Sequence, residues 1–251
     1  MTGSPDLRGQ VALVTGGSSG LGRATALALA TAGADVAVMA RGSADLEQTA
    51  EQVRSSGVRA CEVVVDLADA AAIEPAVQRV RSELGRVNVL VNAAGSDVPG
   101  PVAELDVDAW DRVLAVNLRA SFLLARAVWR DMQTNGGGTI VNVSSVAGRR
   151  GWANAAAYCA AKFGLTGLTQ VLAAEGRRDH IRACVLYPGA MDTSWGVWTP
   201  EDRTNSGPQA PSADALDPEH VARLILWIAT APPDVVVNEV TLTPLMERGW
   251  P

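Results

Sequence analysis

Two residues able to move a proton, Tyr158 and Lys162, stand four positions apart in a segment with helical character. In a helix this spacing places both side chains on one face. A phenol, whose ordinary pKa is about 10, exchanges protons near neutrality only when a nearby cation stabilises the phenolate. A lysine one helical turn away can supply that cation. Ser145 lies thirteen residues before Tyr158, and its hydroxyl could hold a substrate oxygen beside the phenol. The pattern indicates an acid–base site.

The lysine stands out in the composition. The chain has 21 Lys and Arg residues, and Lys162 is the only lysine among them. One interpretation is that a compositional preference for arginine left a single lysine by chance. The other is that this position needs a compact ammonium on a flexible stem, which a planar guanidinium cannot replace. A Tyr-x-x-x-Lys pair alone is typical of any exposed helix face, but here it uses the only lysine and follows a serine, which favours the second interpretation.

A glycine-rich loop joins the first predicted strand to the first predicted helix. It reads Thr15-Gly16-Gly17-Ser18-Ser19-Gly20-Leu21-Gly22. Glycines permit a tight turn and let backbone N–H groups approach a diphosphate at the positive end of the helix. An ordinary glycine-rich turn would look similar, but the place of this loop at the first strand–helix junction favours a dinucleotide site.

The end of the second predicted strand indicates which nicotinamide dinucleotide is bound. An acidic residue there bonds the ribose 2′-hydroxyl, whereas an arginine accommodates a 2′-phosphate. Here Arg41 follows the strand and no carboxylate ends it. We therefore predict NADP(H) rather than NAD(H), with Arg41 and Ser18 at the phosphate. If Arg41 is only a solvated surface charge, NAD(H) remains the alternative.

The elements that must position these residues alternate between strand and helix. The predicted strands span 10–15, 35–40, 59–65, 87–92, 139–143, 181–186 and 235–242. The first predicted helix follows the glycines and runs to about residue 32, and the others span 44–55, 70–84, 109–132, 155–174 and 218–229. Near-continuous Val, Ile and Leu runs are typical of strands buried on both faces. The pattern predicts an α/β fold: a single-domain, Rossmann-type, doubly wound parallel sheet of about seven strands flanked by helices.

Residues 1–251 are expected to form one domain, with a substrate lid at about 194–217, where Pro, Ser, Thr and Asp interrupt the pattern. Three tryptophans fall at the expected mouth and lid: Trp152, Trp195 and Trp198. They could line an apolar substrate pocket or only pack the lid. Arg149 and Arg150 could meet a substrate carboxylate or stay solvated.

Composition excludes several classes of function. The net charge is −6 without a visible basic stripe, so nucleic acid and anionic membranes are poor partners. No apolar run approaches the ~18 residues of a membrane span. Two histidines and three scattered cysteines argue against a zinc site and a disulfide scaffold, and suit a reducing, cytoplasmic location.

Taken together, the motifs resemble the short-chain dehydrogenase/reductase family over nearly the whole chain. The matching segments are 15–22, Asp66, 92–95, Asn117, 144–148, 158–162 and 188–193. Residues 145–149 and 237–244 look like the NADP-dependent 3-hydroxy acid dehydrogenase group of that family. Two departures are Ala93, where the family usually has a second Asn, and Tyr187, where Asn is common.

The resemblance implies a role for each matching residue. Tyr158 would be the general acid or base, and Ser145 would polarise the substrate carbonyl. Lys162 would lower the pKa of Tyr158 and bond the nicotinamide ribose, while Asn117 would hold a water that links Lys162 to solvent. The implied cofactor contacts are Gly16, Ser18, Ser19, Gly20, Leu21, Gly22, Arg41, Asp66, Leu67, Asn92, Ala93, Gly95, Tyr158, Lys162, Pro188, Gly189, Met191 and Thr193.

The expected function is an NADP(H)-dependent ketoreductase or alcohol dehydrogenase acting on a small carbonyl or alcohol substrate. The alternatives are an NAD(H)-dependent enzyme of the same family, an epimerase or dehydratase, and a non-enzymatic dinucleotide-sensing regulator. An epimerase or dehydratase would not need all of Ser145, Tyr158 and Lys162, and a regulator would be expected to have lost Tyr158 or Lys162. Family resemblance also implies a homotetramer or homodimer, with helices 109–132 and 155–174 as contact surfaces.

Overall fold

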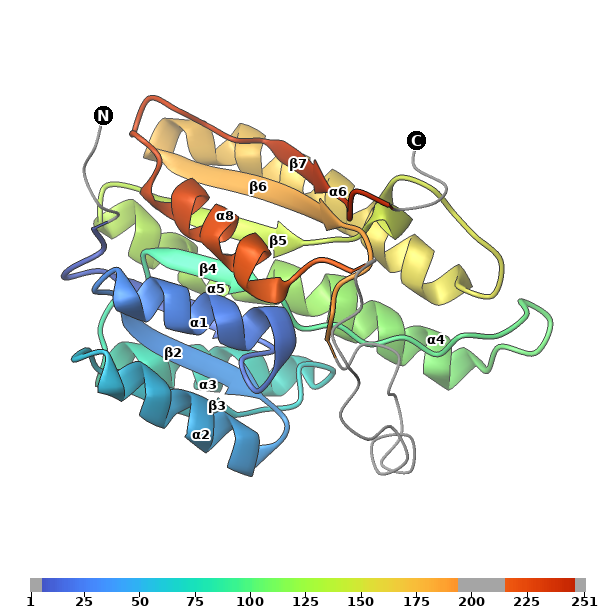
Figure 1. The fold of residues 1–251 in the computed structure, drawn as a ribbon, viewed down its shortest axis with the longest axis horizontal. Helices are drawn as coiled ribbons and strands as arrows, with labels where there is room; N and C mark the ends of the chain where they lie inside the picture. The colour runs from blue at the N-terminus through green and yellow to red at the C-terminus, as the bar shows by residue number, and fades with distance from the viewer. Residues whose placement is uncertain (1–5, 194–214, 247–251) are drawn as a thin grey trace.

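The computed structural model describes residues 6–193 and 215–246. In this part of the chain one seven-stranded sheet has the order β3-β2-β1-β4-β5-β6-β7 (Figure 1). Every neighbouring pair is parallel. The strands are β1 (Val11–Thr15), β2 (Asp35–Ala40), β3 (Ala60–Val64), β4 (Val89–Asn92), β5 (Gly138–Val143), β6 (Ile181–Pro188) and β7 (Glu239–Leu242). This confirms the predicted fold class.

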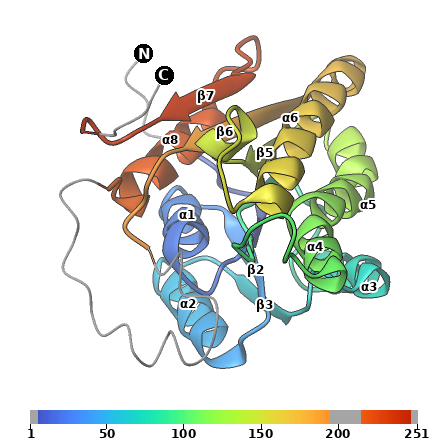
Figure 2. The same cartoon turned by 90° about the vertical axis from the view of Figure 1, so that its right-hand side faces the viewer.

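Helices cover both faces of the sheet. Figure 2 shows α1, α2 and α8 on one side and α3, α4, α5 and α6 on the other. Their bounds are α1 (Gly20–Thr31), α2 (Ser43–Ser55), α3 (Ala70–Glu83), α4 (Val107–Leu114), α5 (Ala120–Thr134), α6 (Ala156–Gly176) and α8 (Pro218–Thr230). Each face encloses its own apolar core, so Leu13 of β1 packs on one side while Val14 packs on the other. This double burial explains why the strands are apolar throughout rather than alternating.

The long helix predicted over 109–132 is interrupted. A π-helical turn, Ala115–Arg119, separates α4 from α5. Asn117 lies in this turn, where its side-chain amide donates to the carbonyl of Val113 (2.9 Å) and to that of Ser96 outside the helix (2.7 Å). Such π-turns are frequent at functional sites.

The last strand is shorter than predicted. It begins at Glu239 rather than at residue 235, and Val235 and Val236 are exposed. The guanidinium of Arg182 donates to the carbonyls of Ala231, Pro232 and Val235 in this segment. These carbonyls face a side chain instead of a neighbouring strand, so the apolar run does not continue the ladder.

The sheet brings the predicted site residues to one edge. The order in which strands are added to the sheet reverses between β1 and β4, although all strands stay parallel. Ligands of doubly wound sheets bind outside the carboxyl ends of the strands at such a switch point. The glycine loop follows β1, Ser145 lies two residues after the end of β5, and Gly189 directly follows β6. In the described ranges no helix is long and apolar enough to cross a bilayer.

Candidate active site

Ser145, Tyr158 and Lys162 lie together at the carboxyl end of β5. Ser145 precedes a short 3-10 turn, Val146–Gly148, and its hydroxyl accepts a hydrogen bond from Ala147 N (3.1 Å). A side-chain hydrogen bond joins Ser145 to Tyr158. The Lys162 Nζ atom lies 5.5 Å from the centroid of the Tyr158 ring. The fold thus brings together the three residues that the sequence singled out, with Tyr158 and Lys162 buried and Ser145 partly exposed.

Lys162 is held in a closed environment, with only 3% of its surface exposed. Its Nζ donates to the carbonyl oxygen of Val143 at the end of β5 (2.8 Å). Burial lowers the pKa of Lys162 to about 7. The buried site therefore suits an amine, which can lose its charge near neutral pH, whereas the guanidinium of an arginine stays charged.

A second serine fixes α6 against β5. The Ser144 hydroxyl donates to the main-chain carbonyl of Lys162 (3.2 Å). Gly148 packs in the same place, where an added Cβ would clash with Ser144 Oγ and with the Lys162 carbonyl. In the sequence, Ser144 and Gly148 stood out only as members of the matching segment 144–148. In the structure, both pack against the main chain of Lys162 and so set its position.

The pKa of Tyr158 is shifted in the direction opposite to the one expected. Burial raises it above its ordinary value, and the negative charge of Asp97 adds to this effect, while the hydrogen bond with Ser145 lowers it. Lys162 was expected to lower it, but its Nζ is directed at Val143, and its own lowered pKa reduces its positive charge near neutrality. The Tyr158 phenol is therefore protonated at neutral pH in this structure and suited to donate a proton.

The Asn117 side chain is engaged by the backbone of the loop after β4. Its Oδ1 accepts from Ser96 N (3.3 Å), and its Nδ2 donates to Ser96 O (2.7 Å) and to Val113 O. Both amide protons are thus used, so the side chain acts as a clamp on the loop. Its expected part in a water-mediated proton relay stays a prediction.

The glycine loop has the geometry of an anion site. Gly16 and Gly20 have φ of +70° and +50°, a region that favours glycine. Gly17 N donates to the carbonyl of Met39 (3.2 Å), which joins the loop to the end of β2. Ser19 precedes α1 without a side-chain capping bond, and the first turn of α1 carries no acidic residue. The N–H groups at this helix start therefore fit a diphosphate.

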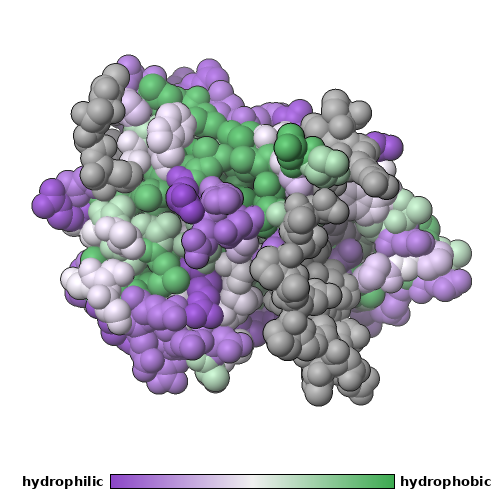
Figure 3. Space-filling model, viewed as in Figure 1, coloured by the Kyte–Doolittle hydropathy of each residue, from purple (hydrophilic) through white to green (hydrophobic). Residues whose placement is uncertain are grey.

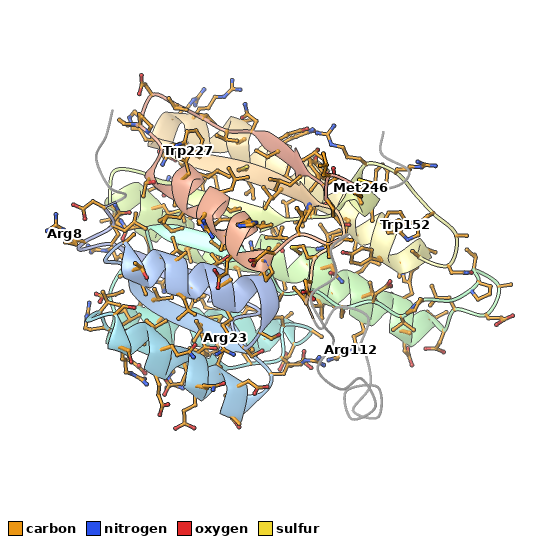
Figure 4. All side chains as sticks on the ribbon, viewed as in Figure 1. Arg8, Arg23, Arg112, Trp152, Trp227 and Met246 are labelled. Carbon is orange, nitrogen blue, oxygen red and sulfur yellow. The ribbon has the colours of Figure 1, made fainter. Side chains whose placement is uncertain are left out.

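The ends of β2 and β3 bring Arg41 and Asp66 near each other. Burial acts to raise the pKa of Asp66, but hydrogen bonds from Ala68 N and Arg112, together with the charges of Arg112 and Arg41, lower it overall. Arg112 extends from α4 (Figure 4). Its guanidinium donates to Asp66 Oδ2 (2.9 Å). Leu67 is buried in the core. The predicted adenosine contacts thus cluster at one end of the sheet edge.

Polar side chains fasten β4 to its neighbours. The Thr15 hydroxyl accepts from Ala93 N and Ala94 N (3.1 Å each). Asn92 donates to Asn142 Oδ1 (2.8 Å), and Asn142 donates in turn to Thr169. Asn92 Oδ1 is buried and has no partner within the described part of the chain. Asn142 was not among the predicted residues. An amide side chain within the otherwise apolar run of β5 is the feature of the sequence that could have indicated its role.

The segment after β6 lies against the glycine loop. Gly189 N donates to Leu242 O (2.7 Å), and Met191 pairs with Leu216 in an isolated bridge. A Cβ on Gly20 would lie 3.1 Å from Thr193 Cγ2. Pro188 ends β6 and Gly95 is exposed in the loop after β4, at the same sheet edge. The predicted nicotinamide contacts are therefore adjacent to the predicted diphosphate contacts.

The predicted substrate residues are placed only in part. Trp195, Trp198 and most of the expected lid at 194–217 lie outside the described residues. Trp152 is 48% exposed on the loop before α6 (Figure 4). Arg149 forms an ion pair with Glu239 and lies over the ring of Tyr187, 4.3 Å from its centroid. Its guanidinium is therefore already paired, although 38% of the side chain is exposed, and a contact with a substrate carboxylate stays a prediction.

A parallel sheet with a glycine loop after its first strand and a Ser–Tyr–Lys cluster after its fifth defines a dinucleotide-dependent dehydrogenase. The chain belongs to the short-chain dehydrogenase family, whose sequence pattern, described as short chain dehydrogenase, matches residues 10–203. It is an oxidoreductase that acts on alcohols and carbonyls with NAD(P) as the hydride carrier. In the described ranges no group of three His, Cys, Asp or Glu residues could hold a metal ion.

Named relatives agree with this assignment. The chain is 40% identical over 190 residues to D-threitol dehydrogenase of Mycolicibacterium smegmatis, covering 76% of this chain and 73% of the relative. It is 37% identical over 235 residues to cis-4-hydroxycyclohexanecarboxylate dehydrogenase of Sinomonas cyclohexanicum, covering 92% and 93%. An alcohol dehydrogenase of Thermococcus sibiricus, solved with 5-hydroxy-NADP, superposes with a TM-score of 0.86 at 28% identity, covering 95% and 98%.

Proposed function

We propose that this protein is an NADP(H)-dependent reductase that interconverts a ketone or aldehyde and an alcohol. The observation that carries the proposal is the hydrogen bond between Ser145 and Tyr158, with Lys162 Nζ over the phenol ring. A protonated phenol bonded to a serine hydroxyl is the arrangement that carbonyl reduction needs. Turnover of NADPH with a panel of ketones, diketones and aldehydes tests it directly.

The chain's own residues divide the work. Ser145 holds the substrate oxygen beside the phenol, and Tyr158 gives that oxygen a proton in reduction and takes it back in oxidation. Lys162 returns a proton to Tyr158, with Asn117 near the path toward solvent. The cofactor, when bound, supplies the hydride.

The dinucleotide is held along the carboxyl edge of the sheet. Gly16, Ser18, Ser19, Gly20, Leu21 and Gly22 would contact the diphosphate, and Asp66 and Leu67 the adenine. Asn92, Ala93 and Gly95 would pass beside the adenosine ribose. The remaining contacts, at the nicotinamide and its ribose, are Tyr158, Lys162, Pro188, Gly189, Met191 and Thr193.

Three observations support NADP(H) over NAD(H). Strand β2 ends at Ala40 without a carboxylate, and Arg41 follows it. A solved relative was complexed with an NADP derivative. Residues 145–149 and 237–244 resemble the NADP-dependent 3-hydroxy acid dehydrogenase group. The proposal does not extend to the acid part of that group's substrate, since the predicted partner of a carboxylate, Arg149, is paired with Glu239.

Arg41→Ala tests the cofactor preference. Loss of a charge-assisted bond to the 2′-phosphate should raise the KM for NADPH by about tenfold or more and leave the KM for NADH nearly unchanged. Steady-state kinetics with both cofactors measure this. Arg178→Ala, an exposed arginine after α6, is the matched control. Tighter binding of NADH than NADPH by the unaltered enzyme, or equal losses for both cofactors in Arg41→Ala, contradicts the proposal.

We also propose a homodimer or homotetramer formed through α4, α5 and α6. Phe122 on α5 and Phe163 and Val171 on α6 are each nearly half exposed. A second apolar area lies over α8 and β7 (Figure 3), where Trp227 is 50% exposed. Burying both areas would remove apolar surface from water.

Light scattering on an eluting peak measures the oligomeric state. We expect the mass of two or four chains, and we expect Phe122→Asp combined with Phe163→Asp to reduce it, because a charge opposes burial at the interface. Glu175→Gln, near the exposed end of α6, is the control for surface changes. A monomeric mass for the unaltered chain contradicts this proposal without affecting the proposed reaction.

A further inference from the structure

Asp97 lies in the loop between β4 and α4 and has no assigned role. Two sets of contacts fix this loop beside the catalytic cluster. Asn117 binds both the N–H and the carbonyl of Ser96, the residue directly before Asp97. Gly100 N donates to the carbonyl of Asn154 (2.9 Å), just before the helix that carries Tyr158. Asp97 is therefore held from both sides between the elements that form the site.

The Asp97 carboxylate is half-buried and lacks a cationic partner. Its Oδ1 accepts from the neighbouring Val98 N (2.8 Å). Over residues 6–193 and 215–246 no ion pair includes it, and burial raises its pKa. A carboxylate withdrawn from water without a cation costs free energy, so a structural role does not explain it.

The negative charge of Asp97 reaches the reacting group. It is one of the charges that shift the titration of the Tyr158 hydroxyl. Arg149, a predicted partner of a substrate carboxylate, is paired with Glu239. The loop contacts and this electrostatic effect together place a negatively charged acceptor near the Tyr158 hydroxyl.

We propose that Asp97 is a specificity-determining residue that accepts a hydrogen bond from a second hydroxyl of the substrate, near the carbon that reacts at Tyr158. The substrates it favours are neutral vicinal diols and the matching hydroxy ketones. A substrate carboxylate at that place meets a like charge and is rejected. This inference rests on the proposed reductase function and names its substrate class.

The test uses three four-carbon alcohols oxidised with NADP+: butane-2,3-diol, butan-2-ol and 3-hydroxybutyrate. For the unaltered enzyme we expect kcat/KM for the diol to exceed that for the mono-alcohol by about tenfold or more, because a hydrogen bond to a charged acceptor is among the stronger ones. Asp97→Ala should bring this ratio close to one, mainly through the KM of the diol. Asp97→Asn should increase the relative rate with 3-hydroxybutyrate.

Glu104→Gln, an exposed carboxylate of the same loop, should keep the diol preference of the unaltered enzyme. A preference that survives in Asp97→Ala overturns the proposal. So does an equal loss for all three alcohols together with a lower melting temperature, because that shows a purely structural role.

A second readout separates this inference from the proposed function. If the unaltered enzyme oxidises none of the three alcohols and reduces none of the matching ketones, the proposed function fails for these compounds. Calorimetric titration of the diol and the mono-alcohol into the protein with NADP+ then decides the role of Asp97. Tighter binding of the diol that disappears in Asp97→Ala supports the inference, and equal binding of both alcohols overturns it.

Discussion

Tyr158→Phe is expected to lower kcat for carbonyl reduction by about 10²–10⁴-fold, the range that a positioned general acid contributes. The variant removes only the hydroxyl that donates the proton. The ring is retained, so its packing against Ala147, Ala155 and Cys159 should persist. The change in NADPH affinity should be much smaller than the change in kcat. Single-turnover kinetics at saturating NADPH measure the chemical step.

Tyr187→Phe is the matched control, because it alters the only other tyrosine in the chain. The Tyr187 hydroxyl is buried without a partner in the described residues, and Arg149 contacts its ring. Removing that hydroxyl should leave turnover within a few-fold of the unaltered enzyme. Equal losses in the two variants would show that Tyr158 is not the acid.

The raised pKa of Tyr158 also predicts the form of the pH profiles. Burial is the main cause of the shift. Reduction needs the protonated phenol, which is present throughout the neutral range, so its kcat/KM should not increase with pH. Oxidation needs a phenol that has lost its proton, so its kcat/KM should rise as the pH increases.

Lys162→Arg is expected to lower kcat by about 10²-fold and to lower the melting temperature as well. The single acceptor for Nζ is the Val143 carbonyl, in a site with 3% of the residue exposed. A guanidinium is larger, keeps four further N–H donors without partners there and stays charged. Both effects follow from burying an ion that cannot lose its proton. If Lys162→Arg keeps near-full turnover, the claim that the site requires an amine is wrong.

Lys162→Met separates the chemical role from the cost of burial. The folded-state pKa of about 7 lies below the ordinary value of 10.5. Between these values the unfolded chain binds more protons, so the stability of the unaltered enzyme rises with pH through this range. The Met variant should therefore be inactive. Its free energy of unfolding should exceed that of the unaltered enzyme by the largest amount below about pH 7, and this difference should shrink toward pH 10. Denaturant unfolding at several pH values measures this difference.

Much of the fold could be predicted because strand and helix leave local periodic signals. The limits of β2 and the start of α3 agree with the predicted ones. The boundary of β7 could not be predicted, because it depends on Arg182, which is more than fifty residues away in sequence from Val235. The π-turn at Asn117 likewise depends on Ser96, in another segment of the chain.

The amino-acid sequence by itself determined the family and the doubly wound sheet, and it singled out Ser145, Tyr158 and Lys162 as the predicted reactive set. Residue type and spacing carry that information, because a helical turn and a strand end fix where such side chains emerge. Only the tertiary structure decided the direction of the Tyr158 pKa shift, to which the charge of Asp97 contributes, and the pairing of Arg149 with Glu239. The physical reason is that burial and charge act through space, among residues from separate strands and loops.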